Sequence, residues 1–221
     1  MSTYLVTGAN RGIGLEYCRQ LKAKGHKVIA VCRETSDELA DLGVTVETGV
    51  DITSDQSVND FAQRLGDQAI AVLINNAGIA DQVTLDDLDF DSIRQQFEVN
   101  ALGMLRFTKA ILPNLHDGSK VIIMTSRMGS IDDNTSGGSY GYRMSKVAVS
   151  MAGKSLSVDL KPEGIAVGIL HPGLVKTRMT GFRDEGISTE ESVTGLLARV
   201  EELNLDNTGT FWHAKGEVLP W

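Results

Sequence analysis

Residues 4–14 read YLVTGANRGIG, a short apolar run followed directly by a loop rich in glycine. The residues after this loop repeat their apolar side chains with the period of a helix, so the stretch predicts a strand, a tight turn and a helix. Gly8 permits backbone angles that a side chain would forbid, and Gly12 permits close approach of a phosphate. Gly14 permits tight packing of the helix on the sheet.

The start of such a helix, with its free N–H groups and positive dipole end, is suited to bind phosphate. A glycine-rich turn alone is a weak signal, because turns use glycine everywhere. This turn lies between the first strand and the first helix of an alternating chain, which favours dinucleotide binding over a plain turn. The residues predicted to contact the nucleotide here are Gly8, Asn10, Arg11, Gly12, Ile13 and Gly14.

The rest of the chain alternates short apolar runs with longer stretches of helical period. The expected strands are Tyr4–Thr7, Lys27–Cys32, Val44–Thr48, Ile70–Asn75, Lys120–Ser126, Ile165–His171 and Thr210–His213. The expected helices are Gly12–Lys24, Ser36–Leu42, Asp55–Leu65, Asp89–Leu115 with a break, Tyr142–Leu160 and Thr189–Leu203. We predict an α/β fold with a single doubly wound, Rossmann-type parallel sheet of about seven strands and helices on both faces. It would form one domain over residues 1–221.

Composition argues against several classes of protein. The formal net charge of −8 argues against a nucleic-acid binder, which needs a basic face to neutralise phosphates. The two cysteines and four histidines form no CxxC or HxxxH spacing, so we expect no metal site and no disulfide framework. No apolar run approaches the ~20 residues that cross a bilayer, and no signal peptide precedes the first strand. We therefore expect a cytoplasmic protein that does not contact a membrane.

The end of the second strand distinguishes the two common dinucleotides. An acidic residue there would bind the adenosine ribose 2′-hydroxyl of NAD(H). The sequence instead has Val31-Cys32-Arg33, and the first acid is Glu34. The guanidinium of Arg33 offers a planar fork to a 2′-phosphate, and Arg11 supplies a second cation within the loop. We predict NADP(H) as the cofactor, with NAD(H) as the less favoured alternative.

Tyr142 and Lys146 form the candidate catalytic pair. In the run YRMSK, residues 142–146, the phenol and the ammonium are four positions apart and share one face of a helix. A free tyrosine titrates near ~10, and a fixed cation nearby lowers its pKa toward a range useful in acid/base catalysis. Tyr140 would pair with Met144 instead, so the spacing selects Tyr142.

Ser126 adds a third member at the end of the fifth strand. Ligands bind at the carboxyl edge of the sheet in this architecture, and the hydroxyl can donate a hydrogen bond to a substrate oxygen as charge develops there. Without Tyr142 and Lys146, a strand-end serine bonded to the backbone would be the default interpretation. We expect the intervening loop Ser130–Gly141 to form a wall of the active site.

Five features, in this order, resemble the short-chain dehydrogenase/reductase family. They are the glycine loop, Asn75-Asn76-Ala77-Gly78 after the fourth strand, Ser126, the spacing Tyr142-x-x-x-Lys146, and Pro172-Gly173-Leu174-Val175-Lys176-Thr177. The resemblance implies that the motif at 75–78 supports the sheet beside the adenosine ribose. It also implies that Asp51 and Ile52 contact the adenine.

The same resemblance implies the catalytic roles. Tyr142 would exchange a proton with the substrate oxygen, and Ser126 would polarise the carbonyl. Lys146 would hold the nicotinamide ribose hydroxyls and tune Tyr142, and Asn100 would anchor a water that links Lys146 to solvent. The nicotinamide carboxamide would lie against Pro172, Gly173, Val175 and Thr177.

Residues 125–131, TSRMGSI, and 209–221, GTFWHAKGEVLPW, resemble the C-factor branch of bacterial proteins linked to cell-contact signalling, and its carbonyl-reductase-like relatives. The resemblance implies an oxidoreductase that moves a hydride between the nicotinamide and a small carbonyl or alcohol substrate. A second hypothesis is a C-factor-like signalling or redox-sensing protein that binds NAD(P)H with incidental turnover.

Substrate contacts and assembly are the least specified features. The residues expected to line the substrate pocket are Met128, Ile131, Met179 and Phe182, with ordinary packing as an equal alternative. The helices at Ala101–Leu115 and Tyr142–Leu160 resemble those by which family members pair, which implies a homodimer or homotetramer.

Overall fold

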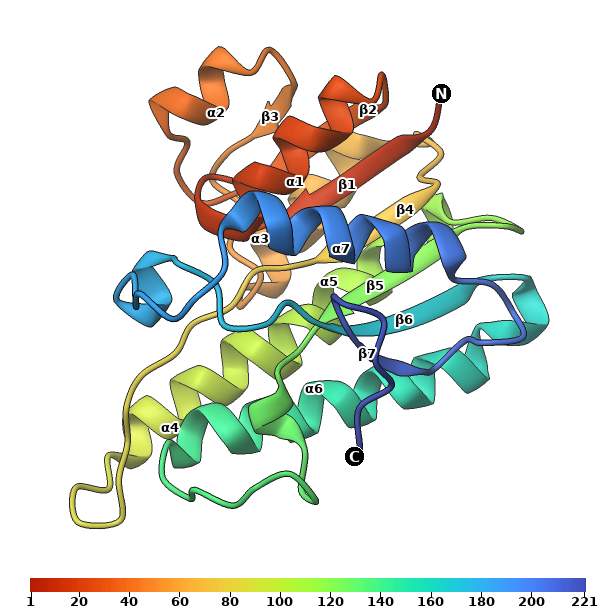
Figure 1. Cartoon of the computed structure of the whole chain (residues 1–221). Coiled ribbons are helices and arrows are strands. Elements are labelled where there is room, and N and C mark those ends of the chain that lie inside the picture. The colour runs from red at the N-terminus through yellow and green to blue at the C-terminus, as the bar shows by residue number, and fades with distance from the viewer.

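One parallel sheet of seven strands organises the computed structural model, which describes residues 1–221 (Figure 1). The strand order is β3-β2-β1-β4-β5-β6-β7. The strands are β1 (Thr3–Thr7), β2 (Lys27–Val31), β3 (Thr45–Glu47), β4 (Val72–Asn75), β5 (Lys120–Met124), β6 (Ala166–His171) and β7 (Phe211–His213). All neighbouring pairs are parallel, so the predicted doubly wound fold is confirmed.

Helices cover both faces of this sheet. They are α1 (Gly12–Ala23), α2 (Asp37–Asp41), α3 (Asp55–Leu65), α4 (Phe90–Phe97), α5 (Met104–Ile111), α6 (Tyr140–Asp159) and α7 (Thr189–Glu202). The apolar residues of α1, α2 and α7 pack on one face, and those of α3, α5 and α6 pack on the other. Alternate strand residues feed the two layers: in β1, Val6 faces the α1 side and Leu5 the α3 side. This alternation is the geometry of a strand buried on both faces.

The carboxyl ends of β1 and β4 lie at the point where the sheet changes winding direction. From β1 the chain proceeds outward to β2 and β3, and from β4 it proceeds the other way to β7. The loops that follow β1 and β4 therefore diverge and leave a crevice, which is where doubly wound sheets bind ligands.

Two boundaries differ from the sequence-based expectation in ways that matter for function. The break expected within Asp89–Leu115 is a π-helical segment, Glu98–Gly103, between α4 and α5. Strand β5 ends at Met124, so Ser126 lies beyond the sheet as the N-cap of a short 3₁₀ turn, Arg127–Gly129. None of the helices combines the length and apolarity needed to span a membrane.

Candidate active site

The phosphate loop is shaped by glycines that could not be replaced. Gly8 has φ +64°, and a Cβ there would stand 2.8 Å from the Cα of Ala77. A Cβ on Gly14 would collide with the carbonyl of Gly8 and stand 2.6 Å from Nδ2 of Asn76. The N–H groups of the first helical residues, 12–14, have no hydrogen-bond partner in the chain. The loop therefore presents free donors at a helix start, as a phosphate site requires.

The motif at 75–78 holds this loop in place from the neighbouring strand. Asn76 donates through Nδ2 to the carbonyls of Thr7 and Gly8, at 3.0 and 3.2 Å. In return the Thr7 hydroxyl accepts from the N–H groups of Asn76 and Ala77, at 3.0 and 3.1 Å. Asn75 points the other way and donates to the Thr108 hydroxyl at 2.9 Å. The motif thus ties β4 to the loop after β1, consistent with the supporting role that the family resemblance implies.

Two arginines stand free beside the loop. Arg11 and Arg33 are exposed, and neither forms an ion pair. Ser36 donates to the main-chain oxygen of Asn10 at 2.8 Å and so joins the loop to the segment after β2. Unpaired guanidinium groups next to free main-chain N–H groups fit a dinucleotide that carries an extra phosphate on its adenosine ribose.

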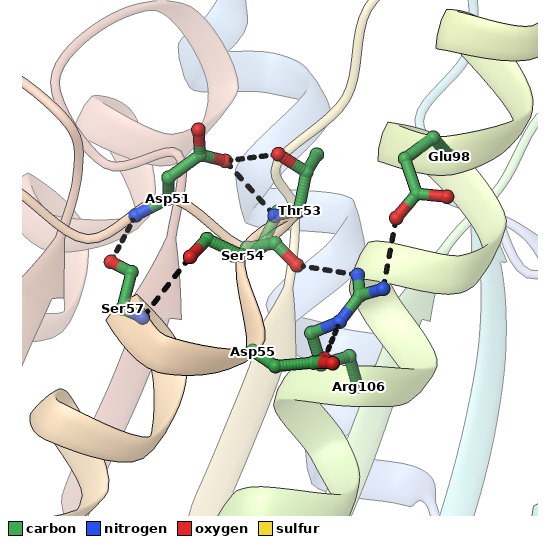
Figure 2. A network of polar contacts seen from close by, with 8 residues as sticks. Asp51, Thr53, Ser54, Asp55, Ser57, Glu98 and Arg106 are labelled. Atoms are coloured by element: carbon green, nitrogen blue, oxygen red, sulfur yellow. Dashed lines mark hydrogen bonds and ion pairs between the residues drawn. The ribbon is translucent and has the colours of Figure 1, made fainter.

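The turn after β3 is closed by its own side chains, as Figure 2 shows. Asp51 accepts at Oδ1 from the N–H and the hydroxyl of Thr53, at 2.9 and 2.7 Å. Its own N–H donates to the Ser57 hydroxyl at 2.9 Å. These bonds, led by the N–H of Thr53, lower the pKa of Asp51, and the charges of Arg33 and Arg106 act in the same direction. The turn is rigid and anionic, and it lies close to Arg33.

Ser126, Tyr142 and Lys146 come together where β5 ends against the start of α6. The Ser126 side chain is buried and accepts from the N–H of Met128 at 3.1 Å. Nζ of Lys146, also buried, donates to the Met124 carbonyl at 3.1 Å and lies 5.6 Å from the ring centroid of Tyr142. The approach of α6 to the turn after Ser126 depends on Gly129, where a Cβ would stand 2.7 Å from the main chain of Lys146.

Burial dominates the electrostatics of Tyr142 and Lys146. Burial raises the pKa of Tyr142, and only the nearby Ser126 hydroxyl opposes it. Burial also lowers the pKa of Lys146 to about 8. Desolvation is thus the largest influence on the phenol. That Lys146 lowers the pKa of Tyr142 stays a prediction. At neutral pH the site holds a protonated phenol beside a cationic lysine.

Asn100 lies in the π-helical segment and is buried. Its side chain accepts from the N–H of Ile79 at 2.8 Å and donates to the Ile79 carbonyl and the Ser145 hydroxyl, both at 2.9 Å. Gly78 separates it from Lys146: a Cβ there would be 3.1 Å from Oδ1 of Asn100 and 3.6 Å from Nζ of Lys146. The amide therefore ties the π-helical segment to the loop after β4 and to α6, beside the lysine.

The segment after β6 reaches back to the phosphate loop. A Cβ on Gly12 would lie 3.5 Å from Cγ2 of Thr177. Val175 is buried and pairs with Ile187, which closes the base of the lid, residues 176–187. Pro172 accepts from the Ser192 hydroxyl at 2.7 Å. The Pro172–Thr177 segment therefore lies over the crevice, as the predicted contact with nicotinamide requires.

His171, which ends β6, is buried as a neutral ring. Its ring packs edge-on against His213 at 5.0 Å, and its Nδ1 is enclosed without a partner. Burial, followed by the effects of His213, Arg127 and Lys146, lowers the pKa of His171 to about 3. The ring is therefore uncharged at neutral pH.

The four residues predicted to line the substrate pocket are not on one surface. Met128 and Ile131 line a hollow of about 250 Å³ together with Tyr140, Met144 and Val147. Met179 and Phe182 are exposed on the lid. Figure 1 shows the lid well apart from the loop that follows Ile131. The loop Ser130–Gly141 itself is pinned by Arg143, which donates to carbonyls at both of its ends.

Sequence reasoning missed a polar clamp on the loop that follows Ser126. Arg127 forms ion pairs with Asp133 and Glu217, both at 3.0 Å. The main-chain oxygen of Trp221 accepts from the Ser130 hydroxyl at 3.1 Å and from the N–H groups of the next two residues at 2.9 Å. Glu217 and Trp221 lie about 90 positions from their partners in sequence, so no local spacing indicates these contacts. Segment 217–221 thus holds the loop that follows Ser126.

Comparison with known proteins agrees with this geometry. Residues 2–187 match the short chain dehydrogenase family. This chain is a short-chain dehydrogenase/reductase. The curated relatives of this oxidoreductase include 1-hydroxy-2-glutathionyl-2-methyl-3-butene dehydrogenase from Rhodococcus sp., 43% identical over the whole of both chains. They also include the C-signal of Myxococcus xanthus, 44% identical over 73% of this chain and 98% of that protein.

The solved structures similar to this short-chain dehydrogenase/reductase include an NADPH-bound carbonyl reductase from chicken fatty liver. The TM-score is 0.92 at 30% identity, with 100% of this chain and 99% of that chain covered. The predicted resemblance to the C-factor branch and its carbonyl-reductase-like relatives is confirmed.

Proposed function

We propose that the chain is an NADP(H)-dependent carbonyl reductase in which Tyr142 gives the proton to the substrate oxygen. The observation that carries the proposal is the group at the carboxyl edge of the sheet in which the half-buried Tyr142 lies beside the buried Ser126 and Lys146. A pure binding protein has no need for a desolvated phenol beside an ammonium. The NADPH-bound relative and the two unpaired arginines support the choice of cofactor.

The bound nicotinamide supplies the hydride, and the chain's residues manage the oxygen. As charge develops on the carbonyl oxygen, the Ser126 hydroxyl stabilises it by hydrogen bonding. Tyr142 then transfers its proton; burial raises its pKa, so the phenol is protonated when it is needed. Lys146 is cationic below about pH 8 and compensates the negative charge left on the phenol oxygen. Pro172–Thr177 would hold the carboxamide so that one ring face meets the substrate.

The test is an absorbance screen for NADPH consumption against aldehydes, ketones and quinones, with alcohols and NADP⁺ in the reverse direction. Tyr142→Phe removes the proton donor, and we expect kcat to fall by about 10³-fold or more while the Kd for NADPH changes little. Tyr4→Phe is the matched control, because Tyr4 lies near the amino end of β1, away from the carboxyl edge of the sheet, and should retain turnover. Equal loss in both variants, or weakened NADPH binding alone, would contradict the assignment.

A second candidate is a signalling or redox-sensing protein, favoured by the 44% identity to the C-signal. It predicts tight NADPH binding by titration without turnover of any carbonyl in the screen. The glutathionyl alcohol named for the Rhodococcus relative places thioether-substituted alcohols and aldehydes in the screen as well.

We further propose that the chain pairs with a second copy through α5 and α6, as the family resemblance implies. Met144, Met151 and Val158 are exposed at one-heptad intervals along α6, and Leu102 and Leu105 are exposed nearby. A continuous apolar stripe of this kind is typical of a helix covered by another protein chain. Light scattering should report a dimer or tetramer, and Met151→Lys should shift it to monomer.

A further inference from the structure

The hydrogen bonds and ion pairs in Figure 2 connect two segments that have separate roles in the proposed mechanism. One is the turn Asp51–Ser54, proposed to contact the adenine. The other is the π-helical segment Glu98–Gly103, which carries Asn100. Single π-helical turns within helices are frequent at functional sites. Here the segment interrupts an otherwise continuous run of helix at the point where it passes the adenine turn.

Arg106, on the first turn of α5, bridges the two parts. Its Nη1 donates to the main-chain oxygen of Ile52 at 3.0 Å, and its Nη2 lies 2.9 Å from Oε1 of Glu98. Its Nε pairs with Asp55 at the start of α3. The Arg106 side chain is half-buried, with 23% of it exposed. The guanidinium can hold these three partners at once because it is planar and carries several donors in fixed directions.

A second contact joins the same two parts by packing. Ile52 lies against Gly103, the last residue of the π-helical segment: a Cβ there would be 3.0 Å from Cγ1 of Ile52. The adenine turn therefore touches both ends of the segment, Glu98 through Arg106 and Gly103 directly. Asn100, between these ends, continues the connection to Ser145 at 2.9 Å, and Ser145 precedes Lys146.

We propose that Arg106 is a positioning residue that couples the occupied adenine turn to Asn100 and so to Lys146. This rests on the proposed function, because it assumes that Asp51–Ile52 binds the adenosine end of the cofactor. Binding of the adenosine would fix the position of Ile52. Because Arg106 contacts both Ile52 and Glu98, it would then fix Glu98 and with it the π-helical segment, so that Asn100 keeps its position beside Lys146. The adenosine half of the cofactor then contributes to the rate at the nicotinamide end.

The test compares NADPH with a hydride donor that has only the nicotinamide half of the cofactor. Carbonyl reduction is measured with NADPH and with reduced nicotinamide mononucleotide, which lacks the adenosine. We expect Arg106→Gln to lower kcat with NADPH by about tenfold, within the usual range of coupling between sites. With the mononucleotide the variant should match the wild type, since no adenosine is present to be coupled. Equal losses with both donors would mean a merely structural role and would overturn the proposal, as would no loss with NADPH.

A second readout needs no turnover. Saturating 2′,5′-ADP should slow hydrogen exchange of the main-chain amides at 98–103 in the wild type, and should not do so in Arg106→Gln. If the carbonyl screen shows no activity but this protection appears, the proposed function fails and the coupling stands. If 2′,5′-ADP binds the wild type without protecting 98–103, the coupling itself is wrong.

Matched variants separate the bridge from general damage. Arg94→Gln removes an exposed pair, Arg94–Asp91 at 2.6 Å on α4, and should behave as wild type in both assays. Glu98→Ala cuts the bridge while leaving Arg106 its contacts to Ile52 and Asp55, and should reproduce the Arg106→Gln pattern even if that variant folds poorly. Arg106→Lys keeps the charge without the fork and should restore little of the NADPH rate.

Discussion

The phosphate loop and the end of β5 offer different groups to a ligand. The phosphate loop offers main-chain N–H groups and has glycines where a side chain would not fit, whereas the end of β5 offers polar side chains. Gly8 and Gly14 admit no Cβ, and the donors at 12–14 are peptide N–H groups. Ser126 and Lys146 instead present buried polar side chains, with the half-buried Tyr142 beside them, and burial shifts the pKa values of Tyr142 and Lys146. Substitutions in the phosphate loop should therefore act through shape, and substitutions in the group at the end of β5 should act through electrostatics.

The largest effect that tests this comparison is expected from Gly14→Ala. The added Cβ collides with the Gly8 carbonyl and with Asn76, so the loop must open. Overpacking of this kind costs about 1–3 kcal/mol, and we expect NADPH affinity by calorimetry to fall about 100-fold. Gly168→Ala, on β6 away from the loop, is the control for stability alone. Unchanged NADPH affinity in Gly14→Ala would show that cofactor binding does not depend on the shape of this loop.

Arg33→Asp tests whether the phosphate side also uses one specific charge. Losing a charge-assisted bond to the 2′-phosphate costs about 1.5–3 kcal/mol, so the KM for NADPH should rise about 30-fold. The KM for NADH should change much less, and steady-state kinetics with both cofactors measure the ratio. Equal rises would mean that Arg33 does not contact a 2′-phosphate.

A pH profile sharpens the electrostatic side of the comparison. Because burial lowers the pKa of Lys146 to about 8, its ammonium form is present below that pH and lost above it. We expect kcat for reduction to fall above about pH 8 by about tenfold per pH unit. In Lys146→Arg the remaining activity should lack this limb, since a guanidinium stays charged. A flat kcat profile up to pH 10 in the wild type would mean that the charge of Lys146 does not affect the reduction.

The smallest effect concerns stability through His171. Its pKa in the unfolded chain is near 6.5 and about 3 in the folded protein, so the unfolded state binds the proton between these values. The stability from the neutral ring is complete above pH 6.5 and falls with acidification by up to about 1.4 kcal/mol per pH unit. Urea unfolding at pH 7 and pH 5 should show a steeper loss in the wild type than in His171→Asn. Parallel losses would mean that the ring is solvated.

The sequence was sufficient for the fold and for the proximity of Tyr142 and Lys146 because both follow local rules. Apolar runs and helical period located all seven strands, and the four-residue spacing of Tyr142 and Lys146 placed them together. The Tyr142 pKa could not be predicted, because desolvation depends on what covers the site. Nor could the contacts of Arg127 and Arg106, since their partners lie far away in sequence or on another helix.

The lid has a consequence for how substrate range can change. Lys176 donates to the Ile187 carbonyl and Ile187 to the Leu174 carbonyl, both at 2.9 Å, so the two ends of the lid are already fastened together. The entropy of closing a loop grows only with the logarithm of its length, by about 0.6 kcal/mol per doubling. Residues inserted at the tip, between Arg178 and Glu185, would therefore enlarge or reshape the mouth of the site at little thermodynamic expense. Such insertions would leave the fastened base, and the crevice beneath it, unaltered.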